Sequence, residues 1–288
     1  PAVGCIVEGV PAGTPIDLEF IRSELARRRP GQSSISTPRK EADEPEILSG
    51  VADGKAMGSA IAIIIRSLTQ RSKDYASIAD KFRPGHADYA YWKKYGLPPV
   101  PGGGRASGRE TAARVAAGAV AKQVLASCGV SVRACALRIG GVQAETIDWN
   151  EVERNPVRSP DAEAAPRMEE AIVAARAKRD SVGGIILCRA DGVPAGWGEP
   201  GFDKIEALLA HAVLSIGAIR GIEFGDGFAV ADRFGSENND VLLPGGRFAT
   251  NHAGGTLGGI SNGDAIVFRC AMKPTASVSQ PQQTVNLK

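Results

Sequence analysis

The sequence has few aromatic residues, few histidines and no long hydrophobic run. Aromatic residues make up 5% of the 288 residues, and only three histidines are present. With 34 basic and 32 acidic side chains the net charge is +2, so neither base stacking nor a basic field points to nucleic acid. No apolar run approaches the roughly 20 residues of a membrane span. We therefore predict neither a nucleic-acid nor a membrane partner, and the most apolar stretch, residues 61–65, predicts a buried strand.

Cysteine is scarce and scattered. The five cysteines form no Cys-x-x-Cys pair and have no histidine at ligand spacing. An odd number of separated cysteines is typical of reduced thiols rather than of a disulfide framework or a zinc site. We predict no metal and a cytoplasmic protein, and no signal peptide is visible.

Two neighbouring segments, residues 82–89 and 102–111, carry the strongest functional signal. They place His86, three consecutive glycines, Arg105 and Arg109 just before an Ala- and Val-rich helix. Free amides at a helix start, flanked by guanidinium groups one turn apart, predict an oxyanion site with His86 as its proton donor. Two alternatives need no ligand: the glycines form a flexible turn, or Ser107 and Glu110 form a capping box.

The chain shows two internal echoes. Residues 5–13 resemble residues 188–196, each ending in Gly-Val-Pro-Ala-Gly, and Gly50 within residues 48–54 aligns with Gly259 within residues 257–263. The pattern predicts one domain, residues 1–288, built from two related halves of about 1–130 and 180–288. Chance similarity of glycine turns is the alternative. Helices are expected over 17–29, 105–127, 162–179 and 203–216, with Asp17 and Asp203 as caps and residues 105–127 buried on most faces.

Eight motifs follow one another in a characteristic order. They are residues 27–33 (RRRPGQS), 70–75 (QRSKDY), 83–88 (RPGHAD), 102–111 (GGGRASGRET), 192–196 (GVPAG), 225–228 (GDGF), 251–255 (NHAGG) and 273–275 (KPT). Together these motifs resemble chorismate synthase, and they cover essentially the whole chain.

The resemblance implies a fold and a reaction. The fold is α+β: a β-α-β sandwich with a helical core between antiparallel sheets and a pseudo-twofold internal duplication, assembled as a homotetramer. The reaction is the last step of the shikimate pathway, the anti 1,4-elimination of phosphate from 5-enolpyruvylshikimate 3-phosphate to give chorismate. It requires reduced FMN, with NADPH as a candidate reductant. Because no flavin reductase domain is visible, we favour an external supply of reduced flavin.

The resemblance also assigns site residues. His86 is the catalytic acid. Substrate or nicotinamide binding falls to Arg28, Arg109 and Ser34, the last at a position where the family usually has arginine. The residues implied to contact flavin are Arg105, Ala106, Ser107, Gly217, Ala218, Gly258, Lys273, Pro274, Thr275, Ala276 and Ser277.

The sequence departs from the family pattern at several points. Besides Ser34, the family usually has Ser at Ala106, Ala at Gly108 and Asp at Thr69. The family's Gly-Glu-Ser-His-Gly motif would precede Pro1, and its Arg-His-Asp-Pro segment would follow Lys288. Two hypotheses follow: an enzyme whose ends lie outside this sequence, or a catalytically silent homologue that binds flavin or phosphate. We favour the enzyme because the central motifs are in place.

Overall fold

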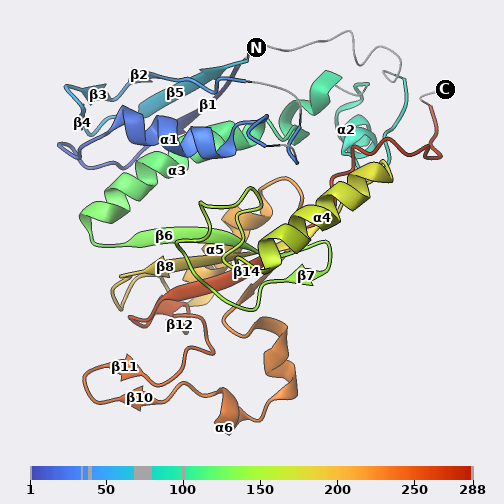
Figure 1. Ribbon diagram of the computed structural model, residues 1–288. Helices are drawn as coiled ribbons and strands as arrows, with labels where there is room; N and C mark the ends of the chain where they lie inside the picture. Colours follow the sequence, from blue (N-terminus) through green and yellow to red (C-terminus); the bar gives the residue numbers. More distant parts are fainter. Residues whose placement is uncertain (1, 34, 38–40, 68–79, 99–100, 287–288) are drawn as a thin grey trace. The chain divides into compact units, whose positions relative to one another are not determined.

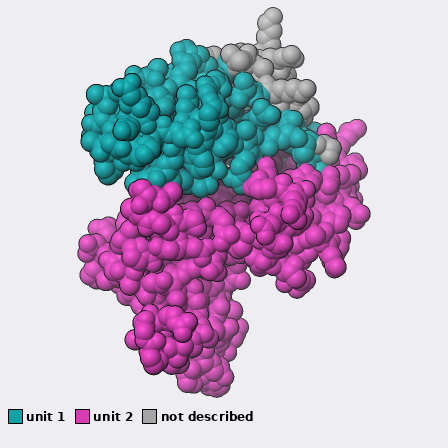
Figure 2. Space-filling model, turned by 60° about the vertical axis from the view of Figure 1, so that its left-hand side comes forward, with its two compact units in different colours: residues 1–124, 279–288 teal, residues 125–278 magenta. Residues whose placement is uncertain are grey.

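A computed structural model describes residues 2–33, 35–37, 41–67, 80–98 and 101–286. Ser34, Thr69 and the motif at residues 70–75 lie outside these residues. The chain divides into two compact units, residues 1–124 with 279–288 (unit 1) and residues 125–278 (unit 2), which Figure 2 colours separately. Both combine helices with antiparallel sheets (Figure 1), which confirms the expected α+β class.

Unit 1 is a three-stranded antiparallel sheet with helices. Its sheet order is β1-β5-β2, so the strand predicted over residues 61–65 is the central one. A short β3-β4 hairpin precedes that strand. The elements are β1 (Ala2–Val7), α1 (Leu18–Arg28), β2 (Pro45–Ser49), β3 (Val51–Ala52), β4 (Lys55–Ala56), β5 (Ile61–Arg66), α2 (Asp88–Tyr95), the 3-10 helix η2 (Pro101–Ala106) and α3 (Glu110–Ser127).

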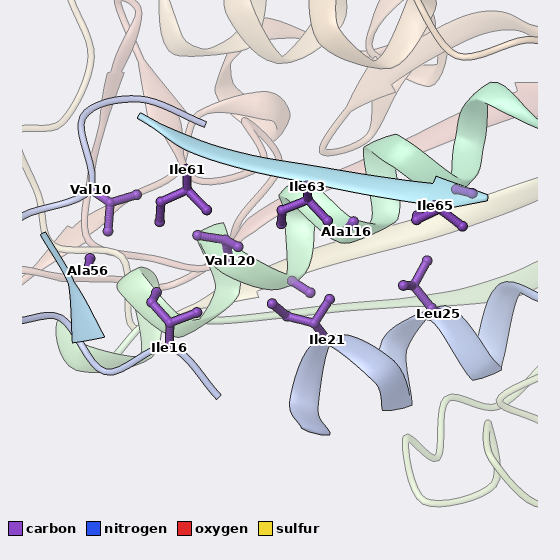
Figure 3. Close-up of a cluster of buried hydrophobic side chains, with 12 residues drawn as sticks. Val10, Ile16, Ile21, Leu25, Ala56, Ile61, Ile63, Ile65, Ala116 and Val120 are labelled. Atoms are coloured by element: carbon purple, nitrogen blue, oxygen red, sulfur yellow. The ribbon is translucent and has the colours of Figure 1, made fainter. Parts of the chain in front are cut away.

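The core of unit 1 follows from the period of β5. Its residues 61, 63 and 65 are buried isoleucines that point to one face, as the two-residue repeat of a strand requires. Ile21 and Leu25 of α1 and Val120 of α3 pack against them (Figure 3). Each such side chain contributes roughly 1.5–3 kcal/mol when fully buried. This packing fixes α1, which begins as predicted after its N-cap Asp17, whose carboxylate accepts the Glu19 amide at 2.8 Å.

Unit 2 is built on a five-stranded antiparallel sheet in the order β7-β6-β8-β14-β9. Val130, Val193, Ile266 and Phe268 form a buried cluster in this unit. Its elements are β6 (Ser131–Ile139), β7 (Val142–Gln143), α4 (Ala164–Ala177), β8 (Gly184–Asp191), η3 (Gly201–Asp203), α5 (Ile205–Leu214), β9 (Ile219–Phe224), η4 (Gly227–Asp232), α6 (Gly235–Asn238), β10 (Leu242–Leu243), β11 (Arg247–Phe248), β12 (Thr256–Leu257), β13 (Ile260–Ser261) and β14 (Ile266–Met272).

Three strands of each unit share one connectivity. In unit 1, β5 comes last along the chain and pairs with both β1 and β2. In unit 2, β14 comes last of the three and pairs in the same way with both β8 and β9. A helix, α1 or α5, connects the first strand to the middle one in both units. The internal duplication itself stays a prediction.

Close backbone contacts at two glycines show which residue of unit 2 occupies the place of Gly50 in unit 1. A Cβ on Gly50 would meet the Ala60 oxygen at 2.5 Å, and one on Gly255 would meet the Ala265 oxygen at 2.4 Å. Gly50 therefore corresponds to Gly255. The expected alignment of Gly50 with Gly259 is wrong by four residues, because both segments are rich in glycine and the sequence alone did not fix the register.

Three helix predictions need correction. Residues 101–106 form a 3-10 helix, and α3 begins at Glu110 rather than at residue 105. Asp203 does not cap α5, which starts after Lys204 with no side-chain cap. Helix α3 buries one face and leaves Arg114, Gly118 and Ala121 exposed, because these residues recur at helical spacing away from the core. In the described part of the chain, no helix has both the length and the apolar character needed to cross a membrane.

Candidate functional site

The turn that carries His86 is fixed by a bidentate ion pair. Arg83 donates from Nε to Asp88 Oδ2 at 2.7 Å and from Nη2 to Oδ1 at 2.9 Å. The Arg83 amide also donates to Asp88 Oδ2, at 3.1 Å. The Arg83 guanidinium lowers the pKa of the Asp88 carboxyl below its ordinary value. This pair closes residues 83–88 into a loop that begins α2.

His86 is half-buried on this loop, and its amide donates to the Arg83 carbonyl oxygen at 3.2 Å. The neighbouring Phe82 is buried, with the Tyr89 and Trp92 ring centroids at 5.4 and 5.3 Å. The Phe82 amide donates to the Val285 oxygen at 3.2 Å. The backbone on both sides of His86 is thus held by the Arg83–Asp88 ion pair, by the packing of the Phe82 ring and by the hydrogen bond to Val285.

The start of α3 is already hydrogen-bonded. The amides of Glu110, Thr111 and Ala112 donate to the carbonyl oxygens three residues earlier at 3.1–3.2 Å. The Arg109 amide donates to Ser107 Oγ at 3.2 Å. The expectation of free amides here is therefore wrong, because a tight 3-10 geometry supplies acceptors within the chain.

Arg105 and Arg109 do not share a helix face. Both precede α3, and they pair with different carboxylates. The Arg105 side chain is 83% exposed and its Nη1 lies 3.0 Å from Glu110 Oε2. The alternative of a capping box is also excluded, since Glu110 binds Arg105 instead of reaching back to Ser107. Ala106, like Arg105, is exposed.

Arg28 and Arg109 converge on one buried carboxylate. Asp43 is fully buried, its Oδ2 accepts from Arg28 Nη1 at 2.5 Å, and its Oδ1 accepts from Arg109 Nη1. Arg28 comes from the last turn of α1 and Arg109 from the segment before α3. Two guanidinium groups on one carboxylate leave a net charge of +1 in a half-buried cluster. We name Arg28, Asp43 and Arg109 the arginine cluster.

In unit 2 the structure brings Ala218 and Lys273 together. The Lys273 amide donates to the Ala218 carbonyl oxygen at 2.9 Å, where the α5–β9 turn meets the end of β14. Ala218 has a φ of 76°, a left-handed conformation uncommon for a residue with a side chain. The following residues form a loop in which the Thr275 oxygen accepts from Ser181 Oγ at 2.7 Å and the Ala276 oxygen accepts from the Val278 amide at 3.0 Å. Pro274 and Ser277, on the same loop, are exposed.

Gly258 does not lie beside Lys273. It occupies the β12–β13 turn before β14 starts, whereas Lys273 follows the last residue of β14. The seven residues of that strand span about 23 Å. The residues that the resemblance assigns to flavin in unit 2 therefore fall into two groups, one at each end of the strand.

A model of the chorismate synthase family matches residues 1–288. The chain belongs to the chorismate synthase family. A solved structure titled "Crystal Structure of Chorismate Synthase" is similar at 32% sequence identity and a TM-score of 0.79, covering 96% of this chain and 85% of that chain. Membership makes this chain an enzyme of the lyase class that acts in the shikimate pathway and binds a substrate. The family implies a requirement for reduced flavin.

The backbone in unit 2 fits such a cofactor at two glycines. Apart from the adjacent residues, no atom of the described residues lies within 4 Å of a Cβ built on Gly217 or on Gly258, so the space in front of each is open. Lys273 adds a half-buried cation next to Gly217 and Ala218. An open backbone face beside a cation suits an anionic planar group, which the chorismate synthase family requires. No group of three or more His, Cys, Asp or Glu side chains suited to a metal ion occurs among the described residues.

Sequence reasoning missed two features of this family member. Asp43 stood unnoticed in an acidic stretch, because nothing in that stretch indicates that one carboxylate is buried between distant arginines. The second feature joins two of the ordered motifs: His252 Nδ1 lies 2.6 Å from Asp226 Oδ2, and the Asp226 amide donates to the His252 oxygen at 3.0 Å. The only sequence signal for this contact was that residues 225–228 and 251–255 both belong to the ordered motifs of the family.

Proposed function

We propose that this chain catalyses the anti 1,4-elimination of phosphate from 5-enolpyruvylshikimate 3-phosphate, giving chorismate with reduced FMN as the cofactor. The bond from the ring to the phosphate oxygen breaks, and a ring hydrogen leaves as a proton. A second ring double bond forms, so the substrate undergoes no net oxidation. We further propose a cytoplasmic homotetramer that receives reduced flavin from an external supply.

The arginine cluster supports this proposal most directly. The substrate carries a phosphate and two carboxylates, and guanidinium groups bind such oxyanions through paired hydrogen bonds. Arg28 and Arg109 are only 20% and 15% exposed. Half-buried cations bind an anion more strongly than solvated surface cations because they are less screened. We assign them to substrate binding.

His86 is proposed to hold the proton that the departing phosphate or the flavin requires. An imidazole changes its charge near neutral pH, so it can donate a proton and be reprotonated under working conditions. Its loop is fixed by the Arg83–Asp88 ion pair, which limits the positions that the ring can take. Limiting those positions favours proton transfer, which depends on hydrogen-bond geometry.

Flavin binding is proposed for Arg105, Ala106 and Ser107 of unit 1, and separately for the residues of unit 2 at the Lys273 end of β14. Reduced flavin supplies the electron density that assists departure of the phosphate. Lys273 would balance the anionic part of the cofactor, and the open backbone at the neighbouring Gly217 would allow close approach.

The test is anaerobic release of inorganic phosphate from 5-enolpyruvylshikimate 3-phosphate with photoreduced FMN. It is run on the 288-residue chain and on the full reading frame that contains it, with oxidised FMN as the blank. Phosphate and chorismate released in equal amounts would support the proposal. Binding of FMN and substrate without turnover in either protein would contradict it and favour the silent homologue.

A further inference from the structure

Asp43 has no place in the reaction as proposed, yet among the described residues it is the one hydrogen-bond partner that Arg28 and Arg109 share. Its side chain is 0% exposed and both of its oxygens face a guanidinium group. It lies 15 residues from Arg28 and 66 residues from Arg109 along the chain. One carboxylate therefore fixes two cations that the sequence keeps far apart.

The backbone at Asp43 is also unusual. Asp43 has a φ of 53°, in the left-handed region that residues with side chains rarely adopt, although Asp and Asn tolerate it better than most. It stands two residues before β2 begins. The fold thus keeps an acidic side chain buried in an unfavourable conformation at the point where two arginines meet.

The other contacts with described residues use only part of each guanidinium group. Arg28 donates from Nε to Thr111 Oγ1 at 3.1 Å and from Nη2 to the Gly108 oxygen at 3.4 Å. With Asp43, these bonds to described residues use three of the five N–H groups of an arginine.

Arg109 is held in the same way. It donates from Nε to Ser67 Oγ and from Nη2 to the Arg66 oxygen, both at 3.2 Å. Its contacts with described residues again use three N–H groups. Contacts with the described residues thus leave two N–H groups on each arginine and one net positive charge in the arginine cluster, which complements a single oxyanion group.

We propose that Asp43 is a positioning residue that orients Arg28 and Arg109 to bind an oxyanion of the substrate; this role rests on the function proposed above. Without a carboxylate between them, the two guanidinium groups repel each other and separate. Loss of the Asp43 charge therefore weakens binding even though it raises the local charge from +1 to +2. An account in which Asp43 only neutralises charge predicts the opposite, tighter binding of the anionic substrate.

The decisive variant is Asp43→Asn, which keeps the size of the side chain and its tolerance of a left-handed backbone. We expect the dissociation constant for 5-enolpyruvylshikimate 3-phosphate to rise at least tenfold, while that for FMN stays within twofold. The matched control is Glu24→Gln. Glu24 is also a carboxylate shared by two cations of unit 1, Lys122 at 3.0 Å and Arg27 at 3.4 Å, and neither has a proposed ligand. The control should leave both constants within twofold.

A double-variant comparison separates positioning from a general structural role. In an Arg109→Gln background Asp43 has only Arg28 to orient, so adding Asp43→Asn should cost about threefold rather than tenfold, a non-additivity expected of groups in direct contact. An equal loss in both backgrounds would overturn the proposal, as would unchanged or tighter binding in Asp43→Asn. If Asp43→Asn alone does not fold, the comparison is made in the Arg109→Gln background. If adding Asp43→Asn there does not weaken binding further, the proposal is overturned. Wild-type protein that does not bind the substrate would contradict the proposed function and this role with it, whereas binding that Asp43→Asn leaves unaffected contradicts only the role of Asp43.

Discussion

The two units carry different side chains at corresponding corners of their sheets. In unit 1, β2 begins near the end of β5, where Pro45 pairs with Ile65. In unit 2, β9 begins at the end of β14, where Ile219 pairs with Met272. A residue with positive φ precedes the middle strand in each unit, Asp43 at 53° and Ala218 at 76°. Each unit therefore has a residue with positive φ close to the start of that strand, two residues before β2 in unit 1 and directly before β9 in unit 2.

What fills the corner differs. In unit 1 the arginine cluster occupies it, and Ser67, the residue after β5, accepts from Arg109 Nε at 3.2 Å. In unit 2 the small Ala218 occupies it, and Lys273, the residue after β14, donates its amide to the Ala218 oxygen at 2.9 Å. Two corners at the same place in the strand order therefore present different side chains, and we infer that these side chains decide what each corner binds. We assign the corner of unit 1, with Arg28 and Arg109, to the substrate, and the corner of unit 2, with Lys273, to flavin.

The largest expected effect comes from a residue that belongs to neither corner. His86→Ala should lower kcat by about 10²- to 10⁴-fold because the proton donor is lost, and should change FMN affinity less than twofold. Stopped-flow measurement of chorismate formation checks this. The control is His211→Ala, which removes an exposed histidine on α5. A wild-type rate in His86→Ala would show that the chemistry does not use this side chain.

A next, smaller effect tests whether the units share their backbone contacts. Gly50→Ala and Gly255→Ala should each cost about 3 kcal/mol of unfolding free energy, because the added Cβ meets a backbone oxygen at 2.5 or 2.4 Å and φ is positive. Urea denaturation measures both. Gly13→Ala and Gly196→Ala are matched controls with positive φ. No described residue other than the adjacent ones comes within 4 Å of their Cβ, so each should cost about 1 kcal/mol. A loss confined to one of the two clashing variants would break the correspondence.

The smallest effect concerns a segment that unit 2 has in addition. Asp161 accepts backbone hydrogen bonds from Ala164, Glu145, Thr146 and Glu163, and these bonds lower its pKa from 3.8 to about 2. The ionised form is therefore favoured in the folded state, and its stabilisation is nearly complete above about pH 5 and is lost as the pH falls toward 2. Asp161→Asn should cost about 2 kcal/mol at pH 7 and much less at pH 2. A cost that does not change with pH would contradict this assignment.

Local signals in the sequence predicted much of the framework. Asp17 marks the start of α1, and the isoleucines of β5 give the central strand, because capping and alternation are short-range effects. The start of α3 could not be predicted, because Ser107 accepts from the Arg109 amide and a 3-10 helix includes residues 105 and 106, where the α-helix was expected to begin. The site was harder still. Arg28 and Arg109 were named from the resemblance, but Asp43 joins them only through tertiary contacts that no local pattern reveals.

The division between the corners is tested most directly by titrating Arg109→Gln and Lys273→Gln separately with 5-enolpyruvylshikimate 3-phosphate and with FMN. Our account predicts that Arg109→Gln weakens substrate binding about 30-fold and leaves FMN binding within twofold, whereas Lys273→Gln weakens FMN binding about tenfold and spares the substrate, as loss of one charged hydrogen-bonding group implies. Equal weakening of both ligands by either variant would contradict it.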